Sequence, residues 1–245
     1  MSRPTAAPLL EVDAVTKRFG GFLALDRVSL HVRAGERLGL IGPNGSGKTT
    51  LINCVSGALA TDGGRILFDG RDITGFPAHQ RTRLGIVRSF QIPKPFTSMT
   101  VLENLGIPME YAARTRSAGS PGPATALDIL QMIGLEAKAH LRPAGLTQIE
   151  MRKLELARAM AARPKLLISD EAMAGLSSAE VDDILALLLR LNAQGITIIM
   201  IEHIMRAVMR FSERVVVLDA GTRIAEGTPD EIVRNPAVEK AYLGE

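Results

Sequence analysis

The segment GPNGSGKT, residues 42–49, is the most informative stretch of this 245-residue sequence. It fits the pattern G-x-x-x-x-G-K-[ST] and lies between a predicted strand, residues 37–41, and an apolar helix predicted to begin near Thr50. Its glycines allow the backbone to approach a phosphate closely, so that successive N–H groups and the helix N-terminus face the anion. The segment therefore predicts a nucleotide-phosphate site. A glycine-rich turn without a ligand is the weaker interpretation, because a strand precedes the segment and a helix follows it.

Two side chains of this segment bring specific chemistry. Lys48 is expected to reach the β- and γ-phosphates, and the Thr49 hydroxyl is expected to ligate Mg²⁺. The residues predicted to contact the nucleotide in this segment are Gly42, Pro43, Asn44, Gly45, Ser46, Gly47, Lys48, Thr49 and Thr50.

A second, acidic anchor for the metal is predicted downstream. Residues 165–171, KLLISDE, form an apolar run, typical of a strand, that ends in two carboxylates. Asp170 fits a water-mediated contact to Mg²⁺, and Glu171, one residue farther from the strand, fits a group that polarises the attacking water. Taken alone, a strand that ends in Asp-Glu is more often a solvated turn. In combination with the phosphate segment, the nucleotide interpretation is favoured.

The pattern of apolar residues predicts the order of elements along the chain. The first quarter is β-rich, with strands expected over residues 9–15, 28–32, 37–41 and 64–68. A helical section is inserted next, with helices expected over residues 78–84, 101–113 and 125–133. Within it, the Ser-, Gly- and Pro-rich residues 114–125 are expected to form a mobile loop. Helices and strands then alternate, as in an α/β core with a parallel sheet: helices over 150–162, 179–191 and 203–210, and strands over 165–169, 196–201 and 214–218.

Composition excludes several classes of protein. The 29 Lys and Arg against 26 Asp and Glu give a net charge of +3, too balanced for a protein that binds nucleic acid by charge alone. The apolar fraction is 46%, but the longest apolar runs, such as residues 196–201, are far shorter than the roughly 18 residues of a membrane span. Residues 1–15 do not resemble a secretory signal peptide. The single cysteine, Cys54, favours a reducing compartment such as the cytosol, although a secreted protein without disulfides would look the same.

Together these residues resemble the ATP-binding cassette (ABC) ATPases over nearly the whole chain. Other motifs follow in the order of that family: Phe19 in KRFGG, Gln91 in RSFQ, and His203 after a strand. The resemblance implies that Phe19 stacks on adenine, that Gln91 touches metal and water and links to the membrane partner, and that His203 is a switch histidine. The expected catalytic residues are then Glu171, His203 and Gln91, and the expected metal residues are Thr49, Gln91 and Asp170.

The resemblance also implies an architecture. The expected fold class is α/β, a P-loop NTPase of the ABC ATPase type with a RecA/F1-like core, an antiparallel β subdomain and an inserted α-helical subdomain. A single domain over residues 8–240 is expected, with the nucleotide-binding core at about 8–90 and 163–240 and the helical subdomain at about 91–162. In this family two cassettes join head to tail, so that each ATP lies between the phosphate loop of one chain and the signature segment of the other.

The signature segment departs from the LSGGQ of the family. The chain has LTQIE at this place: Leu146, Thr147, Gln148, Ile149 and Glu150. Both glycines, which let backbone N–H groups approach the γ-phosphate of the partner, are replaced by residues with side chains. Glu150 also brings a carboxylate near a strongly negative nucleotide, so weaker γ-phosphate binding is expected. The same residues fit a helix capping box, Thr147-x-x-Glu150, and the two interpretations are compatible.

These motifs suggest an asymmetric pair as a hypothesis. The chain would complete one competent ATP site with a second ABC ATPase subunit whose signature is intact, and its own LTQIE would face a weaker site. The alternative is a homodimer, with two weakened sites and slow hydrolysis.

Two further segments resemble the ATPase subunits of branched-chain (hydrophobic) amino-acid importers: FTSMTVLENL at residues 96–105, and the C-terminal AYLGE. Such a subunit would use ATP and Mg²⁺ to energise uptake through two transmembrane permeases and a periplasmic or extracellular substrate-binding protein, without nucleic acid. It would be cytoplasmic and peripheral, on the inner face of the cell membrane. An importer of urea or amides, half of an exporter with separate permeases, and a non-transport ABC ATPase in a soluble complex for DNA repair or translation stay open.

Overall fold

The computed structural model describes residues 7–89, 93–113 and 125–243. Within these ranges the strands are β1 (Leu10–Phe19), β2 (Phe22–Val32), β3 (Arg37–Ile41), β4 (Gly63–Phe68), β5 (Arg71–Asp72), β6 (Ile86–Ser89), β7 (Leu166–Asp170), β8 (Thr197–Ile201), β9 (Arg214–Asp219) and β10 (Thr222–Gly227). The α-helices are α1 (Lys48–Ser56), α2 (Ala78–Leu84), α3 (Val101–Ala113), α4 (Ala126–Ile133), α5 (Gln148–Ala161), α6 (Ser178–Ala193), α7 (Met205–Phe211), α8 (Pro229–Val233) and α9 (Pro236–Leu243). Two short 3-10 turns, η1 (Glu136–Lys138) and η2 (Pro143–Gly145), lie between α4 and α5.

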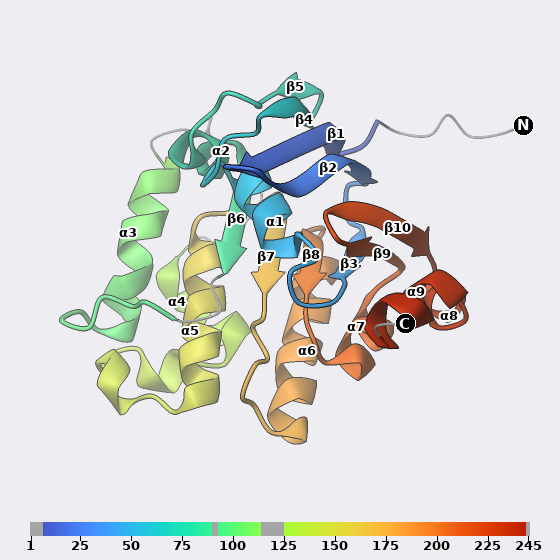
Figure 1. The fold of residues 1–245 in the computed structure, drawn as a ribbon. Coiled ribbons are helices and arrows are strands. Elements are labelled where there is room, and N and C mark those ends of the chain that lie inside the picture. Colours follow the sequence, from blue (N-terminus) through green and yellow to red (C-terminus); the bar gives the residue numbers. More distant parts are fainter. Residues whose placement is uncertain (1–6, 90–92, 114–124, 244–245) are drawn as a thin grey trace, which may run out of the picture.

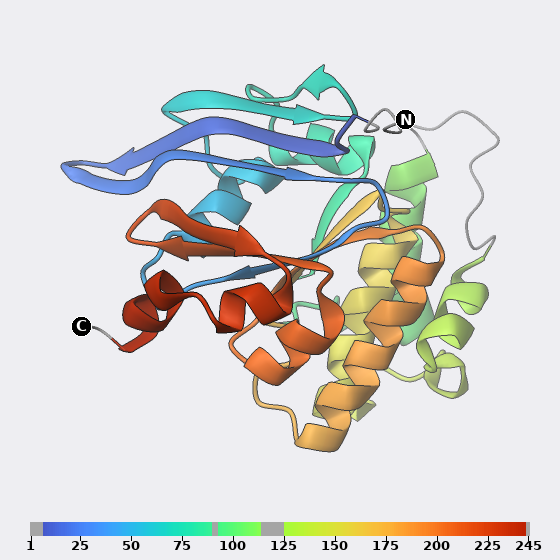
Figure 2. The ribbon, with the colours of Figure 1, turned by 90° about the vertical axis from the view of Figure 1, so that its right-hand side faces the viewer.

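The first sheet is antiparallel, with strand order β2-β1-β4-β5 (Figure 1). Its β1–β2 hairpin is longer than the sequence predicts, because Phe19 pairs with Phe22 across a tight turn at Gly20 and Gly21. Gly20 has φ of 57°, a left-handed conformation that glycine adopts without steric cost. Figure 2 shows this hairpin extending beyond the rest of the sheet.

The second sheet forms the centre of the α/β core, with strand order β10-β9-β3-β8-β7-β6. The strands from β9 to β6 are parallel, as predicted, and β10 pairs antiparallel on the β9 edge. Every residue of β7 and β8 is buried, as is typical of parallel strands covered on both faces. The carboxyl ends of β3, β7 and β8 therefore meet at one edge, where an α/β sheet binds ligands.

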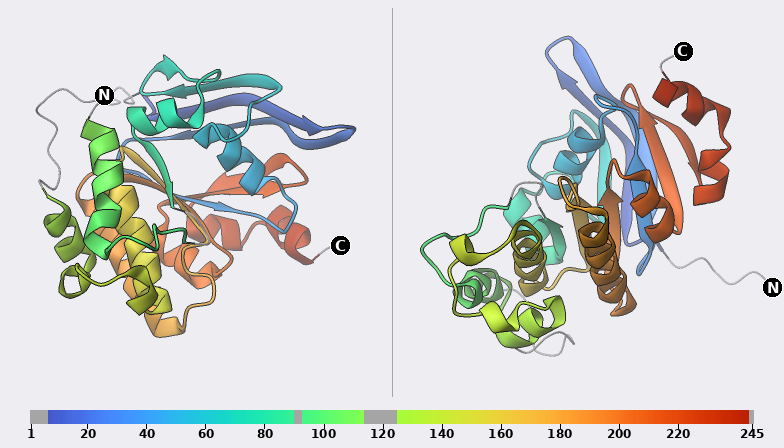
Figure 3. Two further views of the ribbon diagram at one scale, coloured as in Figure 1. Left: turned by 90° about the vertical axis from the view of Figure 1, so that its left-hand side faces the viewer. Right: turned by 90° about the horizontal axis from the view of Figure 1, so that it is seen from below.

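Helices α3, α4 and α5 lie together at one side of the molecule, away from the first sheet (Figures 1 and 3). They share a core with α6, to which each helix contributes buried leucines such as Leu105, Leu130, Leu154 and Leu188. The helix predicted over residues 101–113 is confirmed, and the one predicted over 125–133 begins one residue later. Most of the predicted mobile loop, residues 114–124, lies outside the described residues.

Two predicted helix starts are wrong, and the local structure at each start explains the difference. Helix α5 begins at Gln148 rather than at residue 150, because the Thr147 side chain caps it. Helix α7 begins at Met205 rather than at His203, since Ile204 has the non-helical ψ of 88°. His203 therefore lies in the loop between β8 and α7.

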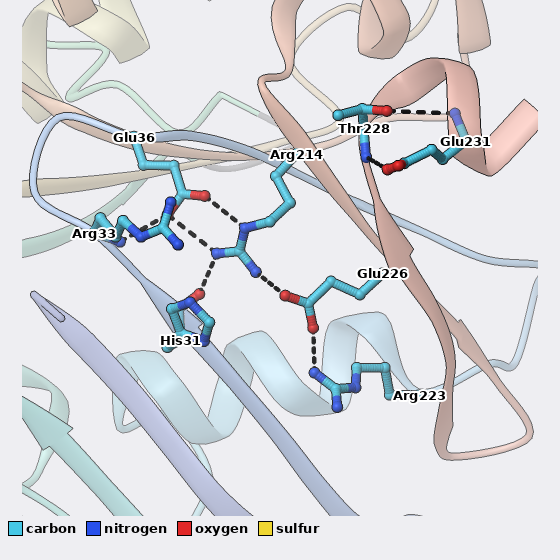
Figure 4. Close-up of polar contacts among 8 residues, drawn as sticks. All are labelled: His31, Arg33, Glu36, Arg214, Arg223, Glu226, Thr228 and Glu231. Carbon is cyan, nitrogen blue, oxygen red and sulfur yellow. Dashed lines mark hydrogen bonds and ion pairs between the residues drawn. The ribbon is translucent and has the colours of Figure 1, made fainter. Parts of the chain in front are cut away.

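A partly buried ion network joins the two sheets (Figure 4). Arg214, at the start of β9, donates to Glu36 Oε1 at 2.7 Å and to the His31 carbonyl of β2 at 2.5 Å, and it also pairs with Glu226 of β10. Burial opposes ionisation of Glu36, but the Arg214 side chain and the Arg33 N–H bond the carboxylate and hold its pKa below the ordinary value. The network fixes the antiparallel sheet against the core that carries the site.

Candidate functional site

The phosphate loop, residues 42–49, connects the buried strand β3 to helix α1. Glycine is required at two of its positions, because φ is positive at each and a Cβ would lie too close to a backbone carbonyl oxygen. Gly42 has φ of 150°, and a Cβ there would lie 2.1 Å from the Leu218 carbonyl oxygen. Gly47 has φ of 101°, and a Cβ there would lie 2.8 Å from the Ala24 carbonyl oxygen. The neighbouring backbone thus holds the loop in one shape.

Helix α1 begins without a side-chain cap. Gly47 occupies the N-cap position in a left-handed conformation and contributes no side-chain acceptor. The first N–H groups of an α-helix have no partner within the helix, and together with the helix dipole they favour an anion. The start of α1 is therefore suited to a phosphate, as the sequence predicts.

Lys48 lies folded over this loop. Its Nζ donates to the Gly42 carbonyl at 2.7 Å, to the Pro43 carbonyl at 2.9 Å and to Ser46 Oγ at 3.4 Å. Burial lowers the pKa of Lys48, and the nearby carboxylates of Glu171 and Asp170 oppose that shift. The loop and the end of β7 are thus close enough to interact electrostatically, as the sequence predicts.

Asp170, the last residue of β7, is bonded to an arginine that sequence reasoning missed. Arg88 of β6 donates from Nη2 to Asp170 Oδ2 at 2.5 Å and from Nε at 3.1 Å. A third nitrogen, Nη1, donates to Asn53 Oδ1 of α1 at 2.6 Å. Arg88 therefore ties the acidic end of β7 to the helix that follows the phosphate loop.

Glu171 and His203 meet at the carboxyl edge of the sheet. Glu171 Oε1 lies 2.9 Å from His203 Nε2, although 32 residues separate them in sequence. The two residues are neighbours because β7 and β8 are adjacent parallel strands. Glu171 also has φ of 48°, which is uncommon for a residue with a Cβ and typical of functional sites.

Glu202 is a buried carboxylate of this edge that sequence reasoning missed. Its side chain is almost fully enclosed and accepts a bond from the Met173 N–H at 2.9 Å. Burial raises its pKa to about 7, and the negative charges of Glu171 and Asp170 act in the same direction. The signal available in the sequence is a Glu between an apolar strand and His203.

Phe19 lies at the tip of the β1–β2 hairpin and is 50% exposed. Phe22, its partner across the turn, is 65% exposed. Paired residues of an antiparallel hairpin place their side chains on the same face. The hairpin therefore presents two phenyl rings, of which sequence reasoning selected only the first. Gln91, the third motif residue, lies outside the described residues.

The LTQIE segment forms the start of α5. Thr147 Oγ1 accepts from the Glu150 N–H at 3.4 Å, and Glu150 Oε2 accepts from the Thr147 N–H at 2.8 Å, so the predicted capping box is present. Lys138 Nζ also lies 2.7 Å from the Glu150 carboxylate. The Lys138 bond and the Thr147 N–H lower the pKa of Glu150. The carboxylate predicted to face a nucleotide is thus bonded within its own chain.

The remaining signature residues differ in exposure. Leu146 and Ile149 are half-buried and pack against the core that contains α3, α4 and α5. The exposed side chain of Gln148 lies near Gly175, where a Cβ would be 2.9 Å from its amide nitrogen. The sequence predicts that the side chains of Gln148 and Ile149, which replace the two glycines, lie near the partner's nucleotide. This expectation fits the exposed Gln148 better than the half-buried Ile149.

The residues fit Mg²⁺ by the chemistry of their donors. Mg²⁺ prefers oxygen ligands and is usually held by one or two protein groups together with substrate phosphates. Thr49, exposed in the first turn of α1, offers a hydroxyl, and Asp170 offers a carboxylate. In the described parts of the chain, no cluster of three or more His, Cys, Asp or Glu is arranged to hold a metal without such phosphates.

Comparison with protein families gives two matches. Residues 25–174 match the family model described as ABC transporter. Residues 222–245 match a model described as branched-chain amino acid ATP-binding cassette transporter.

Individual relatives match over nearly their full length. BraF of Pseudomonas aeruginosa, a high-affinity branched-chain amino acid transport ATP-binding protein, is 40% identical over 97% of this chain and 98% of its own. LivG of Escherichia coli K12, with the same description, is also 40% identical with the same coverage. Among solved structures, the ADP conformation of an ATP-binding cassette of an ABC transporter gives a TM-score of 0.86 at 34% identity, over 98% of this chain and 100% of that one.

Proposed function

The chain belongs to the ABC transporter family, and we propose that it is the ATP-binding and ATP-hydrolysing subunit of an importer for branched-chain amino acids. The phosphate loop and the Glu171–His203 pair support ATP hydrolysis. The transported class rests on one observation, the 40% identity over almost the whole chain to BraF and LivG, together with the match of residues 222–245.

In this function, each group at the carboxyl edge has a role. Lys48 exchanges the carbonyls of Gly42 and Pro43 for phosphate oxygens, and the open N–H groups of α1 bind the same anion. Glu171 accepts a proton from the attacking water or orients it, and His203 holds the Glu171 carboxylate through the 2.9 Å contact. Thr49 would ligate Mg²⁺ and Asp170 would contact it through a water, and the metal would supply positive charge against the phosphates. The exposed ring of Phe19 stacks on adenine, and Gln91 contributes beside the metal.

The chain acts as one member of a pair of cassettes. Its phosphate loop, Glu171 and His203 complete a competent site against a second ABC ATPase subunit with an intact signature. Its own LTQIE faces the weaker site, because the Thr147 side chain engages the Glu150 N–H of α5 and the Glu150 carboxylate adds negative charge at the helix start. A heterodimer follows, with residues 8–240 as a single ABC ATPase domain and about 91–162 as its helical subdomain.

Membrane transport then requires partners. Among the described residues, no helix is long and apolar enough to cross a bilayer. Two permease subunits supply the pathway, a substrate-binding protein delivers the amino acid, and the chain lies peripherally on the inner face of the membrane. ATP binding closes the two cassettes, and hydrolysis reopens them.

A mixed complex tests the catalytic part. Glu171→Gln in this chain only, assembled with the wild-type partner ATPase and the permeases, should lower ATP hydrolysis about 100-fold or more, as removal of a general base does. Glu136→Gln, which changes an exposed carboxylate on η1, is the matched control and should leave hydrolysis unchanged. Retention of most of the hydrolysis by Glu171→Gln would contradict the proposed site.

Uptake by the same complex in vesicles tests the transported class. Labelled leucine should enter in an ATP-dependent manner with wild-type chain and with Glu136→Gln, but not with Glu171→Gln. ATP-dependent entry of urea without leucine would favour an importer of urea or amides instead.

A further inference from the structure

Glu202 connects the two loops that carry the catalytic pair. It follows β8 directly and precedes His203, yet its side chain is only 3% exposed. Its Oε1 accepts from the Met173 N–H at 2.9 Å, two residues after Glu171. The His203 N–H also favours the ionised form of this carboxylate. The buried carboxylate thus bonds the loop after β7 from the residue that directly follows β8.

The backbone at Glu171 needs such support. Its φ of 48° is unfavourable for a residue with a Cβ, and such conformations persist where the surroundings over-determine them. The Glu171 N–H donates to the Ile201 carbonyl at 2.9 Å, and the Ala174 N–H donates to the Glu171 carbonyl at 3.2 Å. With the Met173 bond, residues 201 and 202 hold the strained turn at two points.

We propose that Glu202, the residue before His203, is a positioning residue for ATP hydrolysis, whose carboxylate fixes the backbone of residues 171–173 so that the Glu171–His203 pair keeps its geometry. The inference rests on the proposed role of Glu171. In this role, the buried carboxylate of Glu202 affects the rate of hydrolysis through the position of Glu171 and His203.

The charge of Glu202 adds a signature that a purely structural residue would lack. Burial raises its pKa to about 7, as do Glu171 and Asp170 at the end of β7, whereas the N–H groups of Met173 and His203 favour the ionised form. Both protonation states are therefore populated near neutral pH. The ionised form adds negative charge beside Glu171, so the rate of hydrolysis should change as Glu202 titrates.

Two variants separate positioning from folding in the complete transporter complex. Glu202→Met removes the acceptor oxygens and should lower kcat about 10- to 100-fold, as a small misplacement of catalytic groups does, with less than about a twofold change in KM for ATP. Glu202→Gln keeps an oxygen for the Met173 N–H and should retain more of kcat than Glu202→Met. Its pH profile should lack the limb near pH 7 that is expected of the wild type.

Thr197→Val is the matched control, because Thr197 is buried at the other end of β8 and accepts from the Gly35 N–H at 2.9 Å. It should lower the melting temperature without changing kcat. Wild-type kcat in a folded Glu202→Met, or an unchanged pH profile in Glu202→Gln, would overturn the proposal. If Glu202→Met does not fold, the pH profile of Glu202→Gln decides alone. Glu171→Gln measured alongside keeps the two proposals apart, since full activity in that variant contradicts the catalytic role of Glu171 itself.

Discussion

Helices α1 and α5 both begin at places where the sequence predicts contact with phosphate, but their N-termini are built differently. At α1 the N-cap is Gly47, which offers no side-chain acceptor, and Lys48 is within reach of the loop. At α5 the N-cap is Thr147, and Glu150 completes a reciprocal capping box. Helices α4, α6 and α8 begin with capping boxes of the same kind.

The difference teaches how one fold can hold an open and a closed anion site. A capping box engages backbone N–H groups that could otherwise donate to an anion. Glu150 also places negative charge at the positive end of the helix dipole. The start of α5 is thus stabilised from within, like an ordinary helix of this protein, while the start of α1 is left for a ligand. In the proposed pair with a partner whose signature is intact, the ATP site that faces the capped start of α5 would be the weaker of the two.

The largest expected effect is a difference in ATP affinity between variants of the two lysines beside these helix starts. Lys48→Ala should weaken ATP binding to the isolated chain by about 100-fold, since it removes a charged donor to the phosphates, worth about 2–3 kcal/mol. Lys138→Ala, which removes the partner of Glu150 at α5, should leave that affinity within about twofold. Titration calorimetry with ATP measures both. Equal losses would show that the two helix starts do not differ as described.

A smaller effect, on the rate of ATP hydrolysis, is expected when the glycines are restored at the start of α5. Gln148→Gly with Ile149→Gly restores the glycines of the signature and should raise hydrolysis in the heterodimer several-fold, to at most about tenfold or 1.4 kcal/mol. The same change should lower the free energy of unfolding by about 2 kcal/mol, because two glycines enter the first turn of α5 and the packing of Ile149 is lost. Steady-state ATP hydrolysis measures the change in rate, and denaturant unfolding measures the change in stability. Unchanged hydrolysis would mean that the missing glycines do not limit the weaker site.

The cap itself should be worth about 1 kcal/mol. Thr147→Ala removes the Oγ1 that accepts from the Glu150 N–H and should lower the free energy of unfolding by that amount. Thr147→Ser keeps the hydroxyl and is the matched control, expected within about 0.5 kcal/mol of wild type. Urea unfolding of the isolated chain distinguishes them. If both variants lost the same stability, the capping hydroxyl would not be the cause.

The smallest effect is a dependence on pH. The Lys138 bond and the Thr147 N–H lower the pKa of Glu150 below its ordinary value of 4.5. The ionised Glu150 therefore stabilises the folded chain fully above pH 4.5, and this contribution is lost as the pH falls through the lower, folded-state pKa. Wild type should be more stable than Glu150→Gln at pH 7, and the gap in melting temperature should narrow in acid. A gap that widens as the pH falls would contradict this assignment.

Much of the fold could be predicted from local pattern. The strand over residues 37–41 and the helices over 78–84 and 101–113 were predicted with their observed bounds. The short strands β5 and β6 were missed, because two to four residues show no usable period. The β10 strand was missed as well, since Thr222–Gly227 has few apolar residues and pairs only at the edge of the sheet. The helices α8 and α9 were also missed, because their five and eight residues are too short to show a clear helical period.

The site was predictable where function leaves a sequence motif. The phosphate loop, Glu171 and His203 belong to such motifs, and their proximity follows from the neighbouring strands β3, β7 and β8. Arg88 and Glu202 could not be predicted, because their importance depends on tertiary contacts with Asp170 and Met173, at separations of 82 and 29 residues. Lys138 could not be predicted for the same reason. The expectation that the Glu150 carboxylate repels a nucleotide therefore took no account of its ion pair with Lys138.

The bonds of Lys48 within its own loop bear on the kinetics of nucleotide capture. The ammonium lies against the carbonyls of Gly42 and Pro43, and the close backbone at Gly42 and Gly47 restricts the loop further. Such a binding site is preorganised, so little ordering entropy remains to oppose association. Capture should then be a bimolecular encounter whose observed rate rises linearly with ATP concentration, without the plateau that a slow rearrangement of the loop would impose.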